Sequence, residues 1–233
     1  AELVTIWNVD DLRTPDSIET QARLLLQQPD IGTVYGNFRI VRSFGATDGE
    51  LVDVSAVPAS ELTRSMILGP FFMFRKSLCE RAGYFDEQLK SGADFDLAIR
   101  LALHGKMAMT QTELGYYLNE GLGASTRPNS LQPIERTVIE LRYGIYDKID
   151  YDYLPHTVRY NVPYLLQFGQ WVPISRFVPD YEDFIQDRSN RWFVLGMESY
   201  FARKNRSKRR GLLKRVFRRI NAVIQTTHQR VSR

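Results

Sequence analysis

The chain has 233 residues, of which 43% are hydrophobic and 12% aromatic, as in folded globular proteins. Its one cysteine, Cys79, excludes a disulfide framework and a cysteine-rich metal site, and no apolar run reaches the ~18 residues of a membrane-spanning helix. The net charge of +4 is unevenly distributed, because residues 203–233 hold twelve of the 31 basic residues and none of the 27 acidic ones, which leaves the rest of the chain at −8.

The first quarter of the chain predicts a strand, a helix and a further strand region. Residues 3–7 (LVTIW) are typical of a buried strand. A helix is expected over residues 15–28, with Thr14 as its N-cap. Its apolar face would contain Ile18, Ala22, Leu25 and Leu26. Residues 31–41 predict one or two strands, and Asp48-Gly49 is a hairpin-turn signal.

The next segments continue the alternation of strands and helices. Residues 66–83 predict a strand and a short helix that ends at Gly83. Residues 94–105 predict a helix closed by Gly105, and residues 106–119 contain a strand. This order indicates an α/β fold with a mostly parallel sheet and flanking helices.

The pattern changes after about residue 128. Two helical segments, 132–149 and 180–204, are joined by a stretch rich in proline and aromatic residues. We therefore expect three parts: an α/β domain over 1–127, a helical extension over 128–202 and a basic tail over 203–233.

Two acidic motifs are candidates for chemistry. The first, NVDD at residues 8–11, follows the first strand, and open α/β sheets bind ligands at the carboxyl ends of their strands. Carboxylates at such a place can hold Mg²⁺ or Mn²⁺ together with substrate phosphates. The alternative is a solvated turn that caps the following helix.

The second acidic motif, SGADFD, stands at the start of the helix over 94–105. Asp94 and Asp96 are two residues apart and so do not share a helix face. An acid at this place can act as a general base that takes a proton from a hydroxyl group. The alternative is an acidic first turn that complements the helix dipole.

Together, WNVDDLRTPDSIETQ and GPFFMFRKSLCERAGYFDEQLKSGADFDLAIRLALHGK resemble the family 2 glycosyltransferases of the GT-A fold. In that family a strand ends in a D-x-D-type motif that precedes a proline and a helix. A G-x-F-D-E segment follows farther along, and then an acid at a helix start with an arginine six residues later, here Asp94 and Arg100. The resemblance covers about residues 3–126.

The resemblance implies roles for individual residues. Asp10 would bind the divalent cation, Mn²⁺ or Mg²⁺, and Asn8, where the family has its first acid, would offer a neutral oxygen. Asp11 and Arg13 would lie on the donor side, and Asp94 would be the catalytic base. On the acceptor side the expected residues are Gly69, Pro70, Phe71 and Asp96, although buried strand packing is an equal interpretation of residues 69–72.

The resemblance also implies an activity. The expected enzyme is an inverting glycosyltransferase that moves a sugar from a nucleotide-diphospho-sugar to a saccharide or lipid-linked acceptor in cell-surface glycan or polysaccharide synthesis. It would be cytoplasmic and peripheral at the inner face of the membrane. The family's first nucleotide-binding units would precede Ala1, so the GT-A fold would be incomplete at its N-terminus and this chain alone inactive. The alternative is a non-catalytic glycan-binding or scaffold protein with the same fold.

The basic tail has an apolar stripe between Leu212 and Ile224 at helical spacing, flanked by lysines and arginines. A basic amphipathic helix is typical of binding to an anionic membrane surface. Docking on the chain's own domain and a solvated tail are the alternatives. No groove-reading fold supports a nucleic-acid partner.

Overall fold

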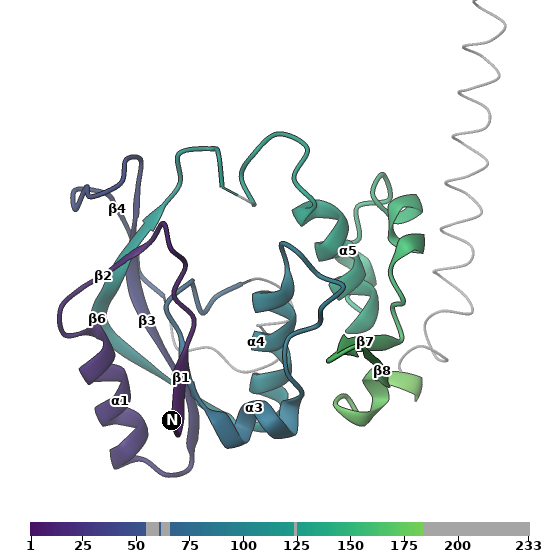
Figure 1. Cartoon of the computed structure of the whole chain (residues 1–233), viewed down its shortest axis with the longest axis horizontal. Coiled ribbons are helices and arrows are strands. Elements are labelled where there is room, and N and C mark those ends of the chain that lie inside the picture. The colour runs from purple at the N-terminus through teal and green to yellow at the C-terminus, as the bar shows by residue number, and fades with distance from the viewer. Residues whose placement is uncertain (55–60, 62–65, 124, 184–233) are drawn as a thin grey trace, which may run out of the picture. The chain divides into compact units, whose positions relative to one another are not determined.

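The computed structural model describes residues 1–54, 61, 66–123 and 125–183 (Figure 1), all within one compact unit that spans residues 1–184. The basic tail and most of the helix predicted over 180–204 lie outside the described residues. Within the described part, no helix is long and apolar enough to cross a membrane.

Strands and helices alternate along the first two thirds of the unit. In chain order they are β1 (Leu3–Thr5), β2 (Leu12–Arg13), α1 (Ser17–Gln27), β3 (Ile31–Val41), β4 (Glu50–Val52), β5 (Met73–Arg75), α3 (Lys76–Ala82), α4 (Ala93–His104), β6 (Lys106–Leu118) and α5 (Gln132–Arg142). Short 3₁₀ helices at Tyr146–Lys148, Leu154–Arg159 and Ile174–Arg176 then surround a hairpin of β7 (Tyr164–Gln167) and β8 (Gln170–Pro173).

The main sheet has the strand order β1-β5-β3-β6-β2, with β4 paired to β3. The prediction of a mostly parallel sheet is wrong for the described strands, because β3 and β6 pair in parallel whereas the other four pairings are antiparallel. The reason lies in the connections. Parallel neighbours need a crossover, usually through a helix, and α3 and α4 lie between β3 and β6 in the chain. The result is a mixed sheet in an α/β unit.

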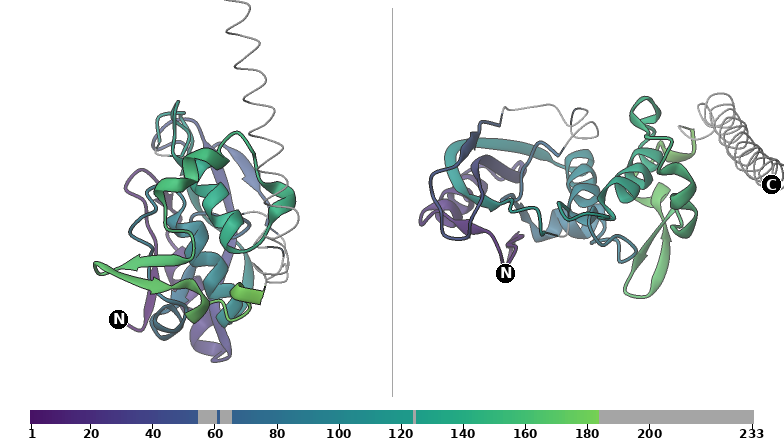
Figure 2. Two further views of the ribbon diagram at one scale, coloured as in Figure 1. Left: turned by 90° about the vertical axis from the view of Figure 1, so that its right-hand side faces the viewer. Right: turned by 90° about the horizontal axis from the view of Figure 1, so that it is seen from above.

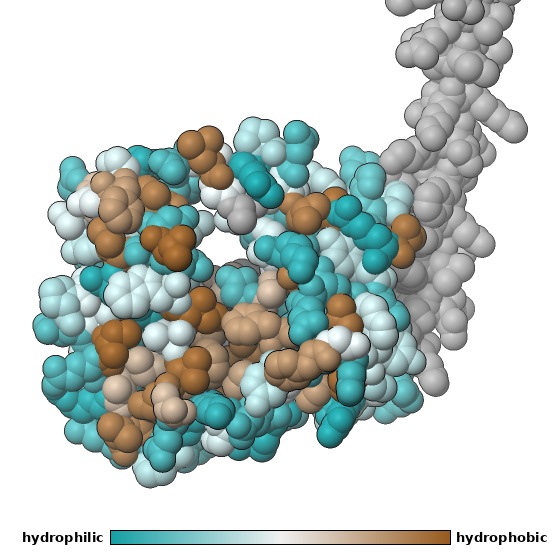
Figure 3. All heavy atoms as spheres, in the orientation of Figure 1, coloured by the Kyte–Doolittle hydropathy of each residue, from teal (hydrophilic) through white to brown (hydrophobic). Residues whose placement is uncertain are grey.

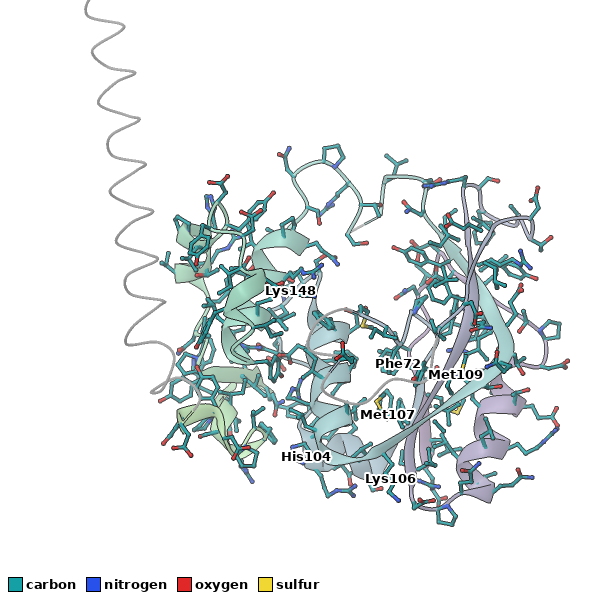
Figure 4. The ribbon with its side chains drawn as sticks, turned by 180° about the vertical axis from the view of Figure 1, so that it is seen from behind. Phe72, His104, Lys106, Met107, Met109 and Lys148 are labelled. Carbon is teal, nitrogen blue, oxygen red and sulfur yellow. The ribbon has the colours of Figure 1, made fainter. Side chains whose placement is uncertain are left out.

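The sheet separates two apolar layers because its side chains alternate between its faces. On one face, Val34 and Met73 pack with Leu25 of α1. On the other, Phe72 and Phe74 pack with Leu78 of α3 and with Leu97 and Leu101 of α4. Figure 4 shows Phe72, Met107 and Met109 between the strands and α4. The first turn of α4 is thereby carried on a rigid helix that lies against the sheet.

Most predicted elements are present with shifted ends. The helices over 94–105 and after residue 75, the strand over 31–41 and the strand after Lys106 are confirmed, and the segment containing Asp48-Gly49 joins the antiparallel strands β3 and β4. The predicted Thr14 cap is wrong, since α1 begins at Ser17 and Asp16 is its N-cap residue. Thr14 instead bonds to β6, where its hydroxyl donates to the Glu113 carbonyl over 2.7 Å.

The last quarter of the unit contains elements that the sequence did not predict. The helix expected over 132–149 ends at Arg142, with Tyr143 as its C-cap residue. The β7–β8 hairpin turns at Phe168 and Gly169, both with positive φ (53° and 73°). Both views of Figure 2 show this hairpin projecting from the helices around it.

Replacing Gly69 by alanine tests the packing between the segment before β5 and β3. Gly69 has φ +66°, and a Cβ there would lie 2.5 Å from the Phe38 ring. We expect Gly69→Ala to lower the free energy of unfolding by about 2–4 kcal/mol, from backbone strain and overpacking together.

The matched control is Gly45→Ala. Gly45 has φ +83° with nothing within 4 Å of the added Cβ. Gly45→Ala should lower the free energy of unfolding only by the cost of backbone strain, about 1 kcal/mol. Urea unfolding of both variants measures the difference, and equal losses would contradict the packing described for Gly69.

Candidate active site

The loop between β1 and β2 presents the first acidic motif. Asn8, Val9 and Asp10 are exposed, whereas Asp11 is buried. Two backbone and side-chain contacts close the loop: the Asp11 amide donates to the Asn8 carbonyl over 3.2 Å, and the Trp7 indole N–H donates to the Asp11 carbonyl over 3.0 Å. Asp10 is therefore the one carboxylate of this motif that faces solvent.

Asp11 uses both of its carboxylate oxygens inside the protein. The Leu118 amide at the end of β6 donates to Oδ1 over 3.0 Å, and Asn8 Nδ2 donates to Oδ2 over 2.8 Å. Burial raises the pKa of Asp11, although these two hydrogen bonds act in the opposite direction. Asp11 thus fixes the loop to β6, and the amide of Asn8 is turned toward it.

Arg13 is half-buried and connects β1 to α1 through hydrogen bonds. Its guanidinium donates to Gln21 Oε1 over 2.9 Å and to the Ile6 carbonyl over 3.1 Å, and it also bonds to the Thr5 hydroxyl. It lies over the rings of Trp7 and Phe71, 5.8 Å and 5.2 Å from their centroids. Burial lowers the pKa of Arg13 to about 10.

These hydrogen bonds explain why the predicted face of α1 is only partly correct: Leu25 is buried and Ala22 packs in the same cluster, but the other two predicted residues do not. Gln21 is fully buried, and its Nε2 donates to the Val34 and Phe71 carbonyls over 3.1 and 2.6 Å. The buried positions are Ser17, Gln21 and Leu25, whereas Ile18 and Leu26 are exposed. The buried Gln21 side chain is satisfied because it accepts a hydrogen bond from Arg13 and donates to these two carbonyls.

The predicted acceptor stretch lies mostly in the core. Gly69 is buried, Phe71 is 1% exposed, and Pro70 is partly exposed. The Phe71 ring meets Phe38 edge-on at 6.2 Å between centroids and lies under Arg13. Of these three residues, Pro70 is the one with exposed surface.

Asp94 lies in the first turn of α4 and is half-buried. Its Oδ1 accepts the Phe95 amide over 2.8 Å. Burial raises the pKa of Asp94 against the lowering effect of this hydrogen bond. In the part of the chain that the structure describes, no lysine or arginine forms an ion pair with it. A carboxyl of this kind can accept a proton at a higher pH than an ordinary aspartate.

Asp96, two residues later, points into the core and is fully buried. Its Oδ2 accepts Arg100 Nη2 over 2.7 Å, and its Oδ1 accepts Arg142 Nη1 over 2.9 Å. The Tyr143 hydroxyl donates to the same Oδ1 over 3.1 Å. Despite burial, the two arginines hold the pKa of Asp96 below its usual range. Asp96 therefore has a structural role, with no oxygen left for an acceptor.

The two arginines connect Asp96 to three further segments. Arg100 Nη1 donates to the carbonyls of Ala82 and Gly83 at the end of α3, both over 2.7 Å. Arg142 Nη2 donates to Asp86 Oδ2 over 2.5 Å and to a backbone carbonyl of β7 over 3.0 Å. We call Asp86, Asp96, Arg100 and Arg142 the ion cluster. All four side chains are fully buried or nearly so, and their formal charges balance.

The first acidic motif offers few oxygen ligands to a divalent cation. No cluster of three or more histidine, cysteine, aspartate or glutamate side chains suited to a metal occurs in the described ranges. Asp11 is committed to internal hydrogen bonds, which leaves the exposed Asp10 carboxylate and the Asn8 amide oxygen. One carboxylate fits Mg²⁺ or Mn²⁺ only when substrate phosphates complete the coordination.

The two motifs lie on two sides of a hollow. Figure 3 shows the surface hollowed between the sheet and the helices α4 and α5, under the segment that joins β6 to α5. In Figure 1 the β1–β2 loop lies on the sheet side of this hollow and the first turn of α4 on the helix side. The loop that contains Asp10 and the helical turn that contains Asp94 thus border the same hollow.

Sequence reasoning missed three residues that organise the site: Asp86, Glu135 and Arg142. Asp86 belongs to the G-x-F-D-E segment, whose internal role the sequence pattern did not reveal. Glu135 and Arg142 lie on the buried face of α5, seven residues apart, where a sequence predicts apolar residues. The sequence offered one sign of them, two charged residues seven apart on a predicted helix, and this pattern is also common on exposed helices.

No family model and no curated protein matches the chain. Among solved structures, the fold is similar to a crystal structure of S. aureus TarS, residues 1–349, with a TM-score of 0.43 and 15% sequence identity over 69% of this chain and 48% of that chain. The chain thus spans about half the length of that structure. A likeness at this level carries no argument about activity, which has to be argued from the residues themselves.

Asparagine in place of Asp96 should be strongly destabilising. Removing the negative charge leaves two buried guanidinium groups without their shared partner, so we expect Asp96→Asn to lower the free energy of unfolding by about 3–5 kcal/mol at pH 7. Asp30→Asn is the control, because Asp30 pairs with Lys106 at the surface and both side chains are well exposed. Urea unfolding should show almost no change for the control. Similar midpoints for both variants would contradict the role given to the ion cluster.

Asp94→Asn should have the opposite effect on stability. Because the folded protein raises the pKa of Asp94, its contribution to stability is full below the unfolded-state value of about 4 and is lost as the pH rises through the folded-state value. The variant should therefore be more stable than the wild type at pH 7, with the gain shrinking toward pH 4. Unfolding curves at the two pH values measure this. A variant that is less stable at pH 7 would mean that Asp94 has an internal partner.

Proposed function

We propose that this chain carries the catalytic and acceptor side of an inverting GT-A-type glycosyltransferase, which transfers a sugar from a nucleotide-diphospho-sugar to a hydroxyl group. One observation carries the proposal. Asp94 is a half-buried carboxyl with a raised pKa and no ion-pair partner in the described structure, and it belongs to the first turn of α4, which borders the same hollow as the Asp10 loop. The family 2 motifs of the sequence support the same function.

The chemistry requires one base on the acceptor side. Asp94 takes the proton of the acceptor hydroxyl while that oxygen bonds to the anomeric carbon. The bond from the anomeric carbon to the diphosphate oxygen breaks, and the nucleoside diphosphate leaves with the bonding electron pair. Attack from the side opposite the leaving group inverts the anomeric centre. A carboxyl whose pKa is raised toward neutrality is the better proton acceptor in this step.

Asp10 would hold the donor diphosphate through Mn²⁺ or Mg²⁺, with Asn8 as a neutral ligand. When bound, such a cation neutralises charge that develops on the leaving diphosphate. The protein's own contribution is to keep Asp10 exposed on a loop that Trp7 closes by its bond to Asp11 and that Asp11 fixes to β6. Arg13 would support the donor side without contacting the donor, because it bonds to the Ile6 carbonyl and lies over the Trp7 ring at the start of this loop. The acceptor side would be formed around Pro70.

The proposed setting is the synthesis of a cell-surface glycan or polysaccharide at the cytoplasmic face of the membrane, with a saccharide or lipid-linked acceptor. The basic tail over 203–233 supports a peripheral contact with an anionic membrane. The charge distribution of the sequence supports the membrane contact, and the family resemblance supports the glycan setting.

A second candidate is a non-catalytic glycan-binding or scaffold protein with the same fold. One observation favours it: of the two acids in the first motif, Asp11 is committed to internal hydrogen bonds, so the loop offers a single carboxylate to a cation. A binding protein of this kind would bind a saccharide and would not turn over a nucleotide-sugar.

The test compares the full-length protein with two variants, Asp94→Asn and Asp10→Ala, against UDP-, GDP- and dTDP-sugars with and without Mn²⁺. Thermal shift measures donor binding, and release of nucleoside diphosphate measures turnover. The wild type should be stabilised by one donor class and should turn it over with a hydroxyl acceptor. Asp94→Asn should keep the thermal shift while turnover falls by ~10²-fold or more.

Asp10→Ala should lose the Mn²⁺-dependent part of the thermal shift and keep the melting temperature of the free protein, because an exposed loop carboxylate contributes little to the core. Stabilisation by saccharides alone, without turnover of any donor, would favour the binding protein. Near-normal turnover in Asp94→Asn would place the base elsewhere.

A further inference from the structure

Glu135, in the first turn of α5, is fully buried and accepts hydrogen bonds from three consecutive backbone amides. The Lys90 amide lies 2.9 Å from both carboxylate oxygens, and the Ser91 and Gly92 amides lie 2.6 and 2.9 Å from Oε2. The Tyr160 hydroxyl donates to Oε1 over 2.9 Å. We call this arrangement the Glu135 clamp.

The clamp gives the loop before α4 the hydrogen-bond acceptors that it lacks within itself. Residues 83–92 form no helix or strand. The Leu89 amide finds the Asp86 carbonyl within the loop, but the amides of residues 90–92 need partners from elsewhere. A carboxylate is an acceptor-only group with several lone pairs, which suits three amides and a hydroxyl at once. Burial, together with the hydrogen bond to Glu135, raises the pKa of Tyr160 to about 12, so this hydroxyl remains a donor at physiological pH.

The loop also lies very close to α5. A Cβ on Gly92 would be 3.0 Å from Ile139 Cδ1 and 3.5 Å from Glu135 Cβ. Gly92 is the N-cap residue of α4, and Asp94 follows two residues later. The position of the Asp94 carboxylate therefore depends on where the clamp holds Gly92.

The same face of α5 holds the other end of the loop. Arg142, seven residues after Glu135, bonds to Asp86. Because residues seven apart lie on one face of a helix, α5 fixes this loop at two points with one rigid element. An element outside the predicted 1–127 domain thus orients the first turn of α4.

We propose that Glu135 is a positioning residue for Asp94, through the three amides that its carboxylate fixes. This inference rests on the proposed function for its catalytic meaning. It makes α5 part of the catalytic unit, since misplacement of a reacting group by about 1 Å can lower a rate ~10²-fold.

The test uses Glu135→Gln, which keeps the shape of the side chain and removes its charge and part of its acceptor capacity. Glu140→Gln is the matched control, because Glu140 lies on the same helix, is 3% exposed and pairs with Arg136. The first readout needs no substrate: the carboxyl carbon of Asp94 is titrated by NMR in the full-length protein. Asp96 titrates at lower pH, because Arg100 and Arg142 hold its pKa down, and so remains distinguishable.

We expect the Asp94 titration to move toward the ordinary aspartate value in Glu135→Gln and to stay unchanged in Glu140→Gln. The second readout is transfer from the nucleotide-sugar identified by thermal shift. There, kcat should fall by about 10- to 100-fold in Glu135→Gln while KM for the donor stays within about twofold.

An Asp94 titration in folded Glu135→Gln that matches the wild type would overturn the inference, as would an equal loss of kcat in Glu140→Gln. If Glu135→Gln does not fold, Glu135→Asp replaces it, because it keeps the charge and withdraws the carboxylate by one methylene group. An unchanged Asp94 titration in that variant overturns the inference as well. A wild type that turns over no nucleotide-sugar counts against the proposed function, while the NMR titration still decides on the clamp.

Discussion

Asp96 shared between Arg100 and Arg142 is the contact on which the rest of this structure depends. Charged groups in a core are tolerated only when each one is paired and its remaining hydrogen-bonding capacity is used. The ion cluster meets that requirement because Arg142 of α5 bonds to the loop before α4 and to strand β7, and Arg100 bonds to the end of α3. Since removal of any member leaves a net charge in the core, the cluster specifies one arrangement of these segments.

As a consequence, the two acids in the first turn of α4 have different roles. Asp96 is fully buried and held by two arginines, whereas Asp94 is half-buried and has no ion-pair partner in the described structure. Burial raises the pKa of both carboxyls, but the arginines outweigh it at Asp96 and nothing comparable does so at Asp94. The same fold that stabilises the unit keeps one carboxyl ready to accept a proton. In the first motif, Asp11 is the fixed acid and Asp10 the exposed one.

The sequence predicted the helices and strands better than their arrangement. Periodicity located α4 and β3, and the two-residue spacing of Asp94 and Asp96 correctly placed them on different faces. Which acid faces inward could not be predicted, because the deciding partner, Arg142, is 46 residues away from Asp96. Gln21 was missed as a buried residue for the same reason, since its partners come from β3 and residue 71. The β7–β8 hairpin was missed because Phe168-Gly169 is a weak turn signal, with a bulky residue at positive φ.

The central claim is that one carboxylate, Asp94, deprotonates the acceptor while the donor leaves from the opposite side. The stereochemistry of the product tests this most directly. Proton NMR of a reaction started with an α-linked nucleotide-sugar reports the configuration of the new anomeric centre from its coupling constant. A single base with in-line attack predicts a β-linked product. An α-linked product would require a second displacement and would contradict the account.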